Sequence, residues 1–593
     1  MKGGKRSSKK NNYYIAYSVD KGSGSDIMTT TVQCLWIGNY LPMMQFVCLQ
    51  SFVLQGIQVH LYSYQKFDHL PPGILWMNAE EILPPSSIYK FKNSYAGFSD
   101  FFRYKLMYVK GGWWIDLDLL CIQASRLIHL DQSTEIVLTK ENREGSIQTN
   151  PLKSSIHHPF FKCLYEKVYR ILFTANLYKK FFQEEESIMW NEESLKRISE
   201  LDYDHLISFP ILDSNQPLPM MGFEDFCALL DLNPEDKRGQ NGWIHFGPEM
   251  LTLASEQNPE MEQYIMNYES FHPISWLNIE KLTQIPSPKF LDKISDSCVM
   301  IDLYSFMWRE KNMDFKKTLL TRNSLLGQII DRTFEHFYEN FCSQCILLIC
   351  SSAKNASKRL QMRRTWLQNC PFSFLFVLSK PNISEPELNE KERILYVPMK
   401  EETYKNLNIK LKLAFDYMVN QKWEYIIKCD DDNYVDCTVL RRILFLQQDM
   451  EIGGPLLNMP ENYDWVQWKE LTNKPIWKGP WLEGYLYWIK KSALEIYVNH
   501  VTDQDLQETM AEDKLLTDML RDHLPNKNFD ARFQFLSGYP DYSGVEYMDV
   551  NKPQKTLEMI HLSLRKNNKL YPPILVYTNC SASMIRSIHS KYR

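Results

Sequence analysis

The chain has 593 residues, and at about 100–200 residues per domain this length favours two large domains or three to four small ones. Hydrophobic residues make up 44% and charged residues 23%, as in ordinary globular proteins, and the formal net charge of −5 argues against a general nucleic-acid-binding protein. No apolar run reaches about 18 residues, so no transmembrane segment is expected.

The N-terminal segment, residues 1–28, begins with several lysines and offers no apolar side chains to bury in its first ten positions beyond the initial methionine. We therefore expect a disordered basic tail. The first residues are charged and no apolar stretch follows them, so we expect no signal peptide. The 13 cysteines are odd in number and scattered, which is typical of reduced thiols. These features together predict a cytoplasmic protein.

The same pattern of predicted elements occurs twice along the chain, in two segments of unrelated sequence. A strand-like run, Thr31–Ile37, begins the first round, and Cys345–Ser351 begins the second. Helical stretches follow, and each round ends with aspartates directly after an apolar segment. Strands that alternate with helices indicate α/β units with a mainly parallel sheet, and ligands of such sheets gather at the carboxyl ends of the strands. Both acid clusters are therefore candidate ligand sites.

The first acid cluster follows a helix and a double glycine. Phe101–Val109 fits an amphipathic helix that Gly111–Gly112 would end. Trp113–Cys121 alternates like one continuous strand, with Asp116 and Asp118 on the same side. Two carboxylates so placed form a half-site for Mg²⁺ or Mn²⁺, which keep open positions for phosphate oxygens. The other interpretation is a solvated strand face that carries two acids.

The sequence around this cluster resembles that of the DXD glycosyltransferases of family 32, which include α-1,4-galactosyltransferases and mannosyltransferases. The matching residues are Ser99, Asp100, Arg103, Tyr104, Gly111, Gly112, Asp116 and Asp118. The resemblance covers about residues 30–310 and implies a GT-A fold and retention of anomeric configuration. It also implies that Asp100, Arg103 and Tyr104 help to bind the donor, and that Asp116 and Asp118 hold the metal.

One position departs from the family 32 pattern. Family members usually show a histidine before a leucine near Ile301–Trp308, and this chain has Asp302 there. An acid cannot donate a hydrogen bond to phosphate as an imidazolium can. We expect either that Asp302 substitutes as a neighbour of the metal or phosphate, or that this head is altered.

The segment Lys311–Glu339 is polar and reads as helical, so it is expected to close the first domain. We place the boundary near Phe341. The predicted domains are therefore residues 29–340 and residues 341–593.

The second acid cluster follows a short apolar strand, Trp423–Ile427. Three adjacent acids, Asp430, Asp431 and Asp432, come next. Adjacent carboxylates repel one another, and a divalent cation is the simplest compensation. Exposed acids in a turn are the alternative interpretation.

Five segments of the second half resemble, in the correct order, the β-1,3-galactosyltransferase and fringe-like enzymes of family 31. They are Arg359–Trp366, Glu401–Lys412, Asp430–Asp432, Pro480–Glu495 and Glu512–Asp513. The resemblance covers about residues 343–565 and implies a second GT-A domain that inverts anomeric configuration. Inversion needs one base opposite the leaving group, and Asp513 is the residue implied, with Glu512 to orient it.

The resemblance to family 31 also implies the remaining roles. Asp432 would be the direct metal ligand, and His561 would complete the metal shell, with His523 as the second choice. Donor binding would fall to five residues: Arg359, Arg363, Lys410, Asp430 and Asp431.

The sequence thus predicts an α/β protein with two tandem GT-A, Rossmann-like domains of the nucleotide-diphospho-sugar transferase type. The expected function is bifunctional glycosyl transfer from nucleotide-sugars, UDP-sugars foremost, to a glycan or glycoprotein acceptor, with Mn²⁺ or Mg²⁺. Such a fusion is typical of bacterial or large-virus proteins. The principal alternative is a carbohydrate-binding or scaffold protein with one or both heads inactive, which Asp302 favours. A phosphatase or nuclease would need a His-rich two-metal pattern, and an ATPase a Walker loop, and the sequence has neither.

Overall fold

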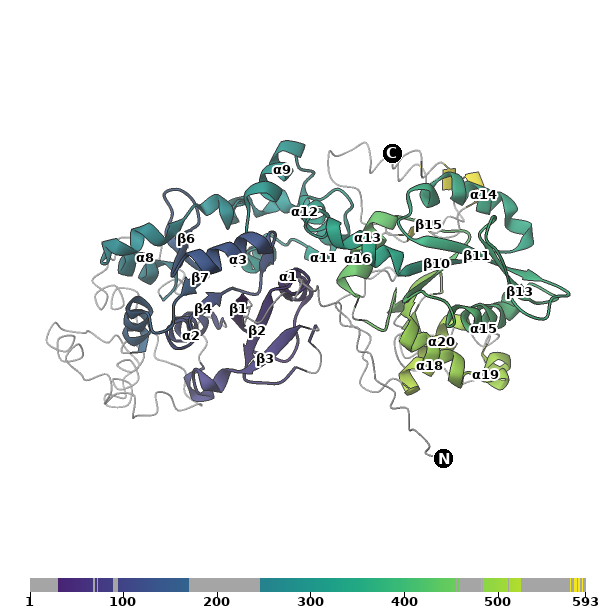
Figure 1. Cartoon of the computed structure of the whole chain (residues 1–593), viewed down its shortest axis with the longest axis horizontal. Helices are drawn as coiled ribbons and strands as arrows, with labels where there is room; N and C mark the ends of the chain where they lie inside the picture. The colour runs from purple at the N-terminus through teal and green to yellow at the C-terminus, as the bar shows by residue number, and fades with distance from the viewer. Residues whose placement is uncertain are drawn as a thin grey trace, which may run out of the picture. The chain divides into compact units, whose positions relative to one another are not determined.

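The computed structural model describes the chain in segments. They are residues 30–67, 70–71, 73–88, 94–169, 246–448, 450–454, 456–457, 481–482, 484–509, 511–523, 576–577, 581–583, 585–586 and 589. The expected basic tail, residues 1–28, and His561 lie outside them. The chain divides into two compact units (Figure 1). The N-terminal unit comprises residues 1–41, 45–275 and 298–303, and the C-terminal unit comprises residues 42–44, 276–297 and 304–593.

The N-terminal unit is built on a seven-stranded sheet of order β3-β2-β1-β4-β7-β6-β8. Its strands are β1 (Thr31–Leu35), β2 (Gln58–Ser63), β3 (Ile74–Asn78), β4 (Gly112–Trp114), β6 (Val137–Lys140), β7 (Ile147–Ser154) and β8 (Ile265–Met266). Strands β3, β2, β1 and β4 are parallel, and β7 is antiparallel to β4. A separate antiparallel pair joins β5 (Leu119–Cys121) to β9 (Met300–Asp302).

Helices cover this sheet because their apolar residues recur every three or four positions. The helices are α1 (Met43–Val53), α2 (Ala96–Val109), α3 (Ala124–Ser133) and α8 (Pro248–Glu256). Phe98, Phe102 and Leu106 of α2 are fully buried, in one cluster with Trp114 of β4. The helix ends where predicted, because Gly111 has φ +64° and a Cβ there would lie 2.7 Å from a backbone nitrogen.

The C-terminal unit has a second seven-stranded sheet, of order β12-β13-β11-β10-β14-β19-β16. Its strands are β10 (Cys345–Cys350), β11 (Ser373–Lys380), β12 (Glu387–Asn389), β13 (Ile394–Pro398), β14 (Tyr425–Asp430), β16 (Ile452–Gly453) and β19 (Leu486–Lys490). Strands β13, β11, β10 and β14 are parallel, and β19 is antiparallel to β14. The described part of this unit also holds two short antiparallel pairs, β15 (Tyr434–Val435) with β20 (Val576–Tyr577), and β17 (Leu456–Leu457) with β18 (Trp481–Leu482).

The helices of the C-terminal unit include three that pack together on one face of this sheet, α15 (Leu407–Met418), α18 (Lys491–His500) and α20 (Glu512–His523). The other helices are α9 (Pro288–Ser297), α10 (Ser305–Glu310), α11 (Phe315–Leu320), α12 (Leu325–Thr333), α13 (Glu335–Ser343), α14 (Ala356–Arg364), α16 (Cys437–Leu446) and α19 (Asp503–Glu508). In the described residues of either unit, no helix combines the length and the apolar character needed to cross a bilayer.

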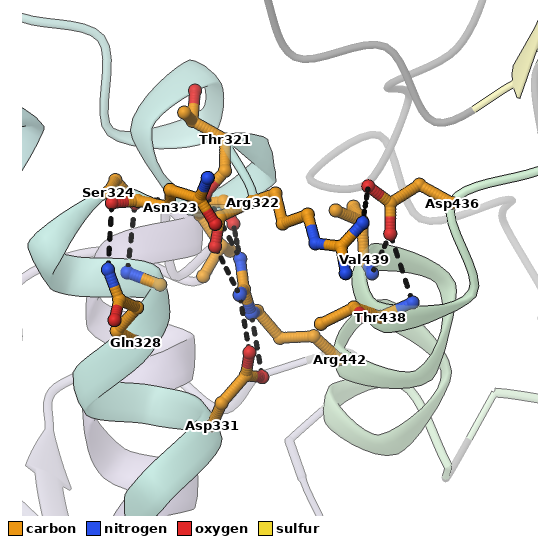
Figure 2. A network of polar contacts seen from close by, with 12 residues as sticks. Thr321, Arg322, Asn323, Ser324, Gln328, Asp331, Asp436, Thr438, Val439 and Arg442 are labelled. Carbon is orange, nitrogen blue, oxygen red and sulfur yellow. Dashed lines mark hydrogen bonds and ion pairs between the residues drawn. The ribbon is translucent and has the colours of Figure 1, made fainter. Parts of the chain in front are cut away.

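Helices α11 to α13, which were predicted to close the first domain, lie in the C-terminal unit. Arg442 of α16 binds them there (Figure 2). Its guanidinium pairs with both carboxylate oxygens of Asp331 on α12, at 2.9 and 2.6 Å, and donates to the carbonyl oxygens of Leu319 and Thr321 at the end of α11. The functional boundary at residue 340/341 stays a prediction.

The predicted α/β class is confirmed, since each unit has a mixed sheet whose four-strand parallel part alternates with helices. The architecture agrees with the expected GT-A-like α/β fold. The strands predicted at Thr31–Ile37, Cys345–Ser351 and Trp423–Ile427 correspond to β1, β10 and β14.

Candidate functional site

The first acid cluster lies in a turn, and the prediction of one continuous strand over Trp113–Cys121 is wrong. Strand β4 ends at Trp114 and pairs with β1 and β7, whereas β5 pairs with β9. Two hydrogen bonds explain the break: the Asp116 N–H donates to the Asn150 side chain at 2.6 Å, and the Leu119 N–H donates back to the Asp116 carbonyl at 3.2 Å. The aspartates therefore stand beyond the carboxyl end of β4.

Arg103 joins two of the predicted site carboxylates. Its guanidinium lies 2.9 Å from Asp100 and 2.9 Å from Asp116, and 4.9 Å from the centre of a Trp114 ring. The indole N–H of Trp114 donates to the same Asp116 oxygen at 2.9 Å. Burial raises the pKa of Asp100 to about 7, and Arg103 counteracts this rise. The structure thus brings Asp100, Arg103 and Asp116 together as a triad, in which the two carboxylates share the guanidinium of Arg103.

A second layer of polar side chains supports this turn. The Asn150 amide donates to Asp302 at 3.3 Å, and Nδ1 of His272 lies 3.9 Å from the same Asp302 oxygen. Nε2 of His272 contacts the Thr139 hydroxyl at 3.3 Å. Burial lowers the pKa of His272 to about 4, so its imidazole is neutral at physiological pH. Sequence reasoning missed Asn150 and His272, because neither is near an acid motif along the chain.

Tyr104 has a different position from the one that the resemblance implied. Its hydroxyl donates to the backbone carbonyls of Phe246 and Gly247, at 2.7 and 3.3 Å. Gly247 is the residue that precedes helix α8. Tyr104 therefore holds the start of α8 against α2, and its role in donor binding stays a prediction.

In the C-terminal unit, several predicted donor-binding residues converge on Ser351, which directly follows β10. The Ser351 hydroxyl donates to Asp431 at 2.6 Å and accepts from Arg359 at 2.8 Å. Lys410 donates to the Ser351 carbonyl. Asn355 also donates to Asp431, at 2.8 Å. Sequence reasoning missed both Ser351 and Asn355, whose residue types are too common to stand out.

Arg363 is not brought to this convergence point. Its guanidinium lies over the rings of Phe376 and Phe374, at 4.7 and 5.5 Å, and it donates to the Glu392 carbonyl. These contacts attach α14 to β11 and to the segment before β13. The role of Arg363 in donor binding stays a prediction.

Asp432, the predicted metal ligand of this unit, faces a cation that the motif did not include. Lys358 of α14 lies 3.8 Å from Asp432 and 3.8 Å from Asp431. The Asp432 side chain is 31% exposed, so solvent reaches it. Burial raises the pKa of Asp432, and Lys358 opposes this shift.

The late acid pair begins helix α20, and Gly484 packs directly against it. A Cβ at Gly484 would lie 2.8 Å from a Glu512 oxygen and 3.0 Å from an Asp513 oxygen, so only glycine fits without displacement. The Gly484 N–H donates to the Asp513 carboxylate. Burial and the neighbouring Glu512 raise the pKa of Asp513, which makes its carboxylate a stronger base. Lys428 joins this pair to the acid cluster, because it contacts both Glu512 and Asp430.

The acid residues of each unit offer oxygen ligands to a divalent cation. No group of three or more histidine, cysteine, aspartate or glutamate side chains suited to a metal ion occurs within the described ranges. Mg²⁺ commonly needs only one or two carboxylates plus substrate phosphates, and both clusters offer carboxylate oxygens. Asp116 accepts its bonds from Arg103 and Trp114 through the same oxygen, Oδ1. The ligand set therefore fits a cation completed by a diphosphate.

The predicted histidine ligands of the metal stay a prediction. His561 lies outside the described residues. His523 ends helix α20, about 15 Å along the axis from Asp513 at 1.5 Å per residue, and its ring packs at a tilt of 40° against His500 with centroids 4.1 Å apart.

Comparisons with known proteins add little beyond the fold. No protein-family model and no curated protein sequence matches the chain. Similar solved structures include the PaToxG glycosyltransferase, with 11% identity, a TM-score of 0.21 and coverage of 40% of this chain and 72% of that one. The ligand-free glycosyltransferase domain from the YGT toxin has 11% identity, a TM-score of 0.25 and coverage of 45% and 89%. The UDP-bound form of that domain has 10% identity, a TM-score of 0.26 and coverage of 51% and 97%. At these values, function has to be inferred from the two sites.

Proposed function

We propose that the chain is a bifunctional glycosyltransferase whose two units each take a sugar from a nucleotide-sugar, UDP-sugars foremost, and transfer it to a glycan or glycoprotein acceptor. One observation carries this proposal. In both units an acid cluster stands at the carboxyl end of the edge strand of the parallel run, β4 in one and β14 in the other. This is the position at which α/β sheets bind ligands, where the strand order reverses.

The C-terminal unit supplies a base for an inverting, β-1,3-type transfer. The Asp513 carboxylate takes the proton of the acceptor hydroxyl as that oxygen bonds to the anomeric carbon. The bond from this carbon to the phosphate oxygen breaks, and the nucleotide diphosphate leaves with the electron pair. Ser351, Arg359 and Lys410 support the donor from the end of β10, where Asp431 fixes the Ser351 side chain.

The N-terminal unit is proposed to retain anomeric configuration, with Asp100 and Arg103 on the donor. Asp116 and Asp118 would hold Mn²⁺ or Mg²⁺ in this unit, and Asp432 in the other. When bound, such an ion neutralises the charge that develops on the departing diphosphate. Arg103 lies beside these acids and adds positive charge at the same place.

A second function is proposed for the N-terminal unit, namely sugar or nucleotide binding without turnover. The pairing of Arg103 with both Asp100 and Asp116 favours it, because this cation is already neutralised in the absence of donor. Asp302, which stands where the family pattern has a histidine, favours it too.

Release of UDP tests both proposals on the full-length chain. UDP-galactose, UDP-glucose and UDP-N-acetylglucosamine would be supplied with Mn²⁺, and Asp118→Asn and Asp513→Asn would be compared singly and combined. Two active heads predict that each substitution removes part of the UDP release and that the double variant releases none. If only Asp513→Asn lowers UDP release, the N-terminal unit does not turn over these donors, as the second proposal expects. If neither substitution changes UDP release, the proposed sites are wrong.

A further inference from the structure

Lys428 is a buried lysine in the middle of β14, an interior strand of the sheet. Its side chain is 1% exposed, and its partners in the sheet are Leu348 of β10 and Tyr487 of β19. Lysine is almost never fully buried unless its charge is paired, because transfer of an ammonium group out of water is costly. A lysine at this position therefore calls for an explanation.

The ammonium group of Lys428 has three donors, and three partners take them. Nζ lies 2.8 Å from Asp430 and 3.0 Å from Glu512, and it donates to the Gly484 carbonyl. Burial alone would lower the pKa of Lys428, but the two carboxylates outweigh it and the pKa is raised. The lysine is therefore charged at neutral pH.

Each of these partners belongs to the proposed transfer site. Asp430 ends β14 beside the metal-binding acid, Glu512 precedes the proposed base, and the Gly484 N–H donates to Asp513. Lys428 thus contacts the acid cluster that is proposed to face the donor. It also contacts the loop and the start of the helix that position the proposed base.

Stability does not account for this arrangement. A buried ion pair usually contributes little net stability compared with apolar residues of similar volume, because desolvation offsets the attraction. Arg442 of the same unit is the contrasting case (Figure 2). It is also fully buried and paired with a carboxylate, but its partners are Asp331 and the backbone carbonyls at the end of α11, none of which is a predicted site residue.

We propose that Lys428 is a positioning residue for sugar transfer by the C-terminal unit, and that it acts through Glu512 to hold Asp513 against the donor acids. This inference rests on the proposed transferase function. Asp430, Glu512 and the Gly484 carbonyl hold the ammonium in one place. The same bonds hold the start of α20 at a fixed distance from the end of β14. A neutral side chain of similar length would release Glu512, and Asp513 would lose its alignment with the acceptor hydroxyl.

A double-mutant cycle tests this role in the full-length chain. All proteins carry Asp118→Asn, so that UDP release from UDP-galactose, UDP-glucose and UDP-N-acetylglucosamine with Mn²⁺ reports the C-terminal unit. In this background Lys428→Met is expected to lower kcat about 100-fold, the cost of a misplacement near 1 Å. The same substitution in a Glu512→Gln protein is expected to lower kcat less than about 3-fold, because residues that act through each other are not additive.

The binding of UDP with Mn²⁺, measured by calorimetry, separates alignment from donor binding. The Kd of the Lys428→Met protein is expected to stay within about 5-fold of the Kd of the parent, because Arg359, Lys410 and Asp431 are unchanged. Those residues are proposed to bind the donor, whereas Lys428 is proposed to align the base, which affects kcat and not donor affinity. Arg442→Met is the matched control: it removes a buried cation from the same unit, and it is expected to lower Tm without changing kcat.

Two results would overturn the inference: an unchanged kcat in Lys428→Met, or a loss of kcat that is equal with and without the Glu512→Gln substitution. If Lys428→Met does not fold, the double variant with Glu512→Gln carries the test, because it leaves one carboxylate, Asp430, without its cation instead of two. It should then fold and turn over as Glu512→Gln does, and a further loss would contradict the proposal. If the parent neither binds UDP nor releases it, the transferase function itself fails, which is a separate result from any Lys428 effect.

Discussion

The two units place their acids at equivalent points of similar sheets, but they neutralise them differently. In the N-terminal unit the cation is Arg103, which comes from the helix before the strand and binds Asp100 and Asp116. In the C-terminal unit the cations are Lys428, from the strand itself, and Lys358, from α14. Lys358 makes only long contacts of 3.8 Å, and Asp432 remains partly exposed. Asp116 and Asp432 are similarly exposed, at 35% and 31%, so the two units differ in how firmly the compensating cation is held.

This difference bears on which head is active. A buried arginine shared by two carboxylates must give one of them up before it can bind a phosphate, and breaking such a pair is costly. A lysine at 3.8 Å can move to a diphosphate at little cost. We therefore expect the C-terminal unit to be the stronger transferase.

The largest effect is expected for Asp513→Asn. An amide cannot accept the acceptor proton, and general base catalysis contributes about 10²–10⁴-fold, so UDP release by the C-terminal unit should fall about 1,000-fold. Steady-state kinetics in the Asp118→Asn background would measure it. A loss below about 10-fold would mean that another group accepts the proton.

Arg103→Met is expected to destabilise the N-terminal unit by about 3–5 kcal/mol, because it leaves Asp100 and Asp116 without their shared cation. Hydrogen exchange of peptides from α2 would measure it. Asp100→Asn in the same protein should recover part of the loss. Full protection of α2 in Arg103→Met would show that the triad is not holding this helix.

His272 should make the N-terminal unit less stable in acid. Its pKa in the folded chain is about 4, below the ordinary 6.5, so the unfolded chain binds the extra proton between these values. The free energy of unfolding is therefore unaffected by this titration above pH 6.5. It decreases by about 3 kcal/mol as the pH falls to 4, at 1.36 kcal/mol per pKa unit.

Asp302 lies 3.9 Å from His272, so the measurement for His272 is the difference between the parent and His272→Gln. Urea unfolding at about pH 7.5 and about pH 4.5, on either side of the ordinary histidine pKa, would give it. The glutamine variant should lose less stability on acidification than the parent. Equal losses would show that the imidazole is not held neutral by the fold.

Gly484→Ala tests how closely the acids of the C-terminal unit are packed. A methyl group would lie within 3.0 Å of both Glu512 and Asp513 and would displace them. A shift near 1 Å can lower a rate about 100-fold, so kcat should fall by about that factor while the Kd for UDP changes little. Unchanged kcat would mean that α20 can move without loss of alignment.

Much of the fold could be predicted because local patterns report local structure. Alternating strands and helices, the double glycine after α2, and aspartates directly after apolar runs were all read from neighbouring residues, and the corresponding elements form. The site was predicted only in part: Asp100, Arg103 and Asp116 do meet, as do Arg359, Lys410 and Asp431 at Ser351. Arg363 lies over the Phe376 ring, and its role in donor binding stays a prediction.

The amino-acid sequence by itself determined which segments form most of the strands and which acids follow them, because side-chain periodicity and glycine content act within a few residues. Only the tertiary structure decided which charges compensate those acids. Asn150 breaks the strand at Asp116, and Lys428 reaches Glu512, across 34 and 84 positions of chain. No local pattern encodes such distances; the sheet brings these partners together, and burial makes each unpaired charge too costly to leave alone.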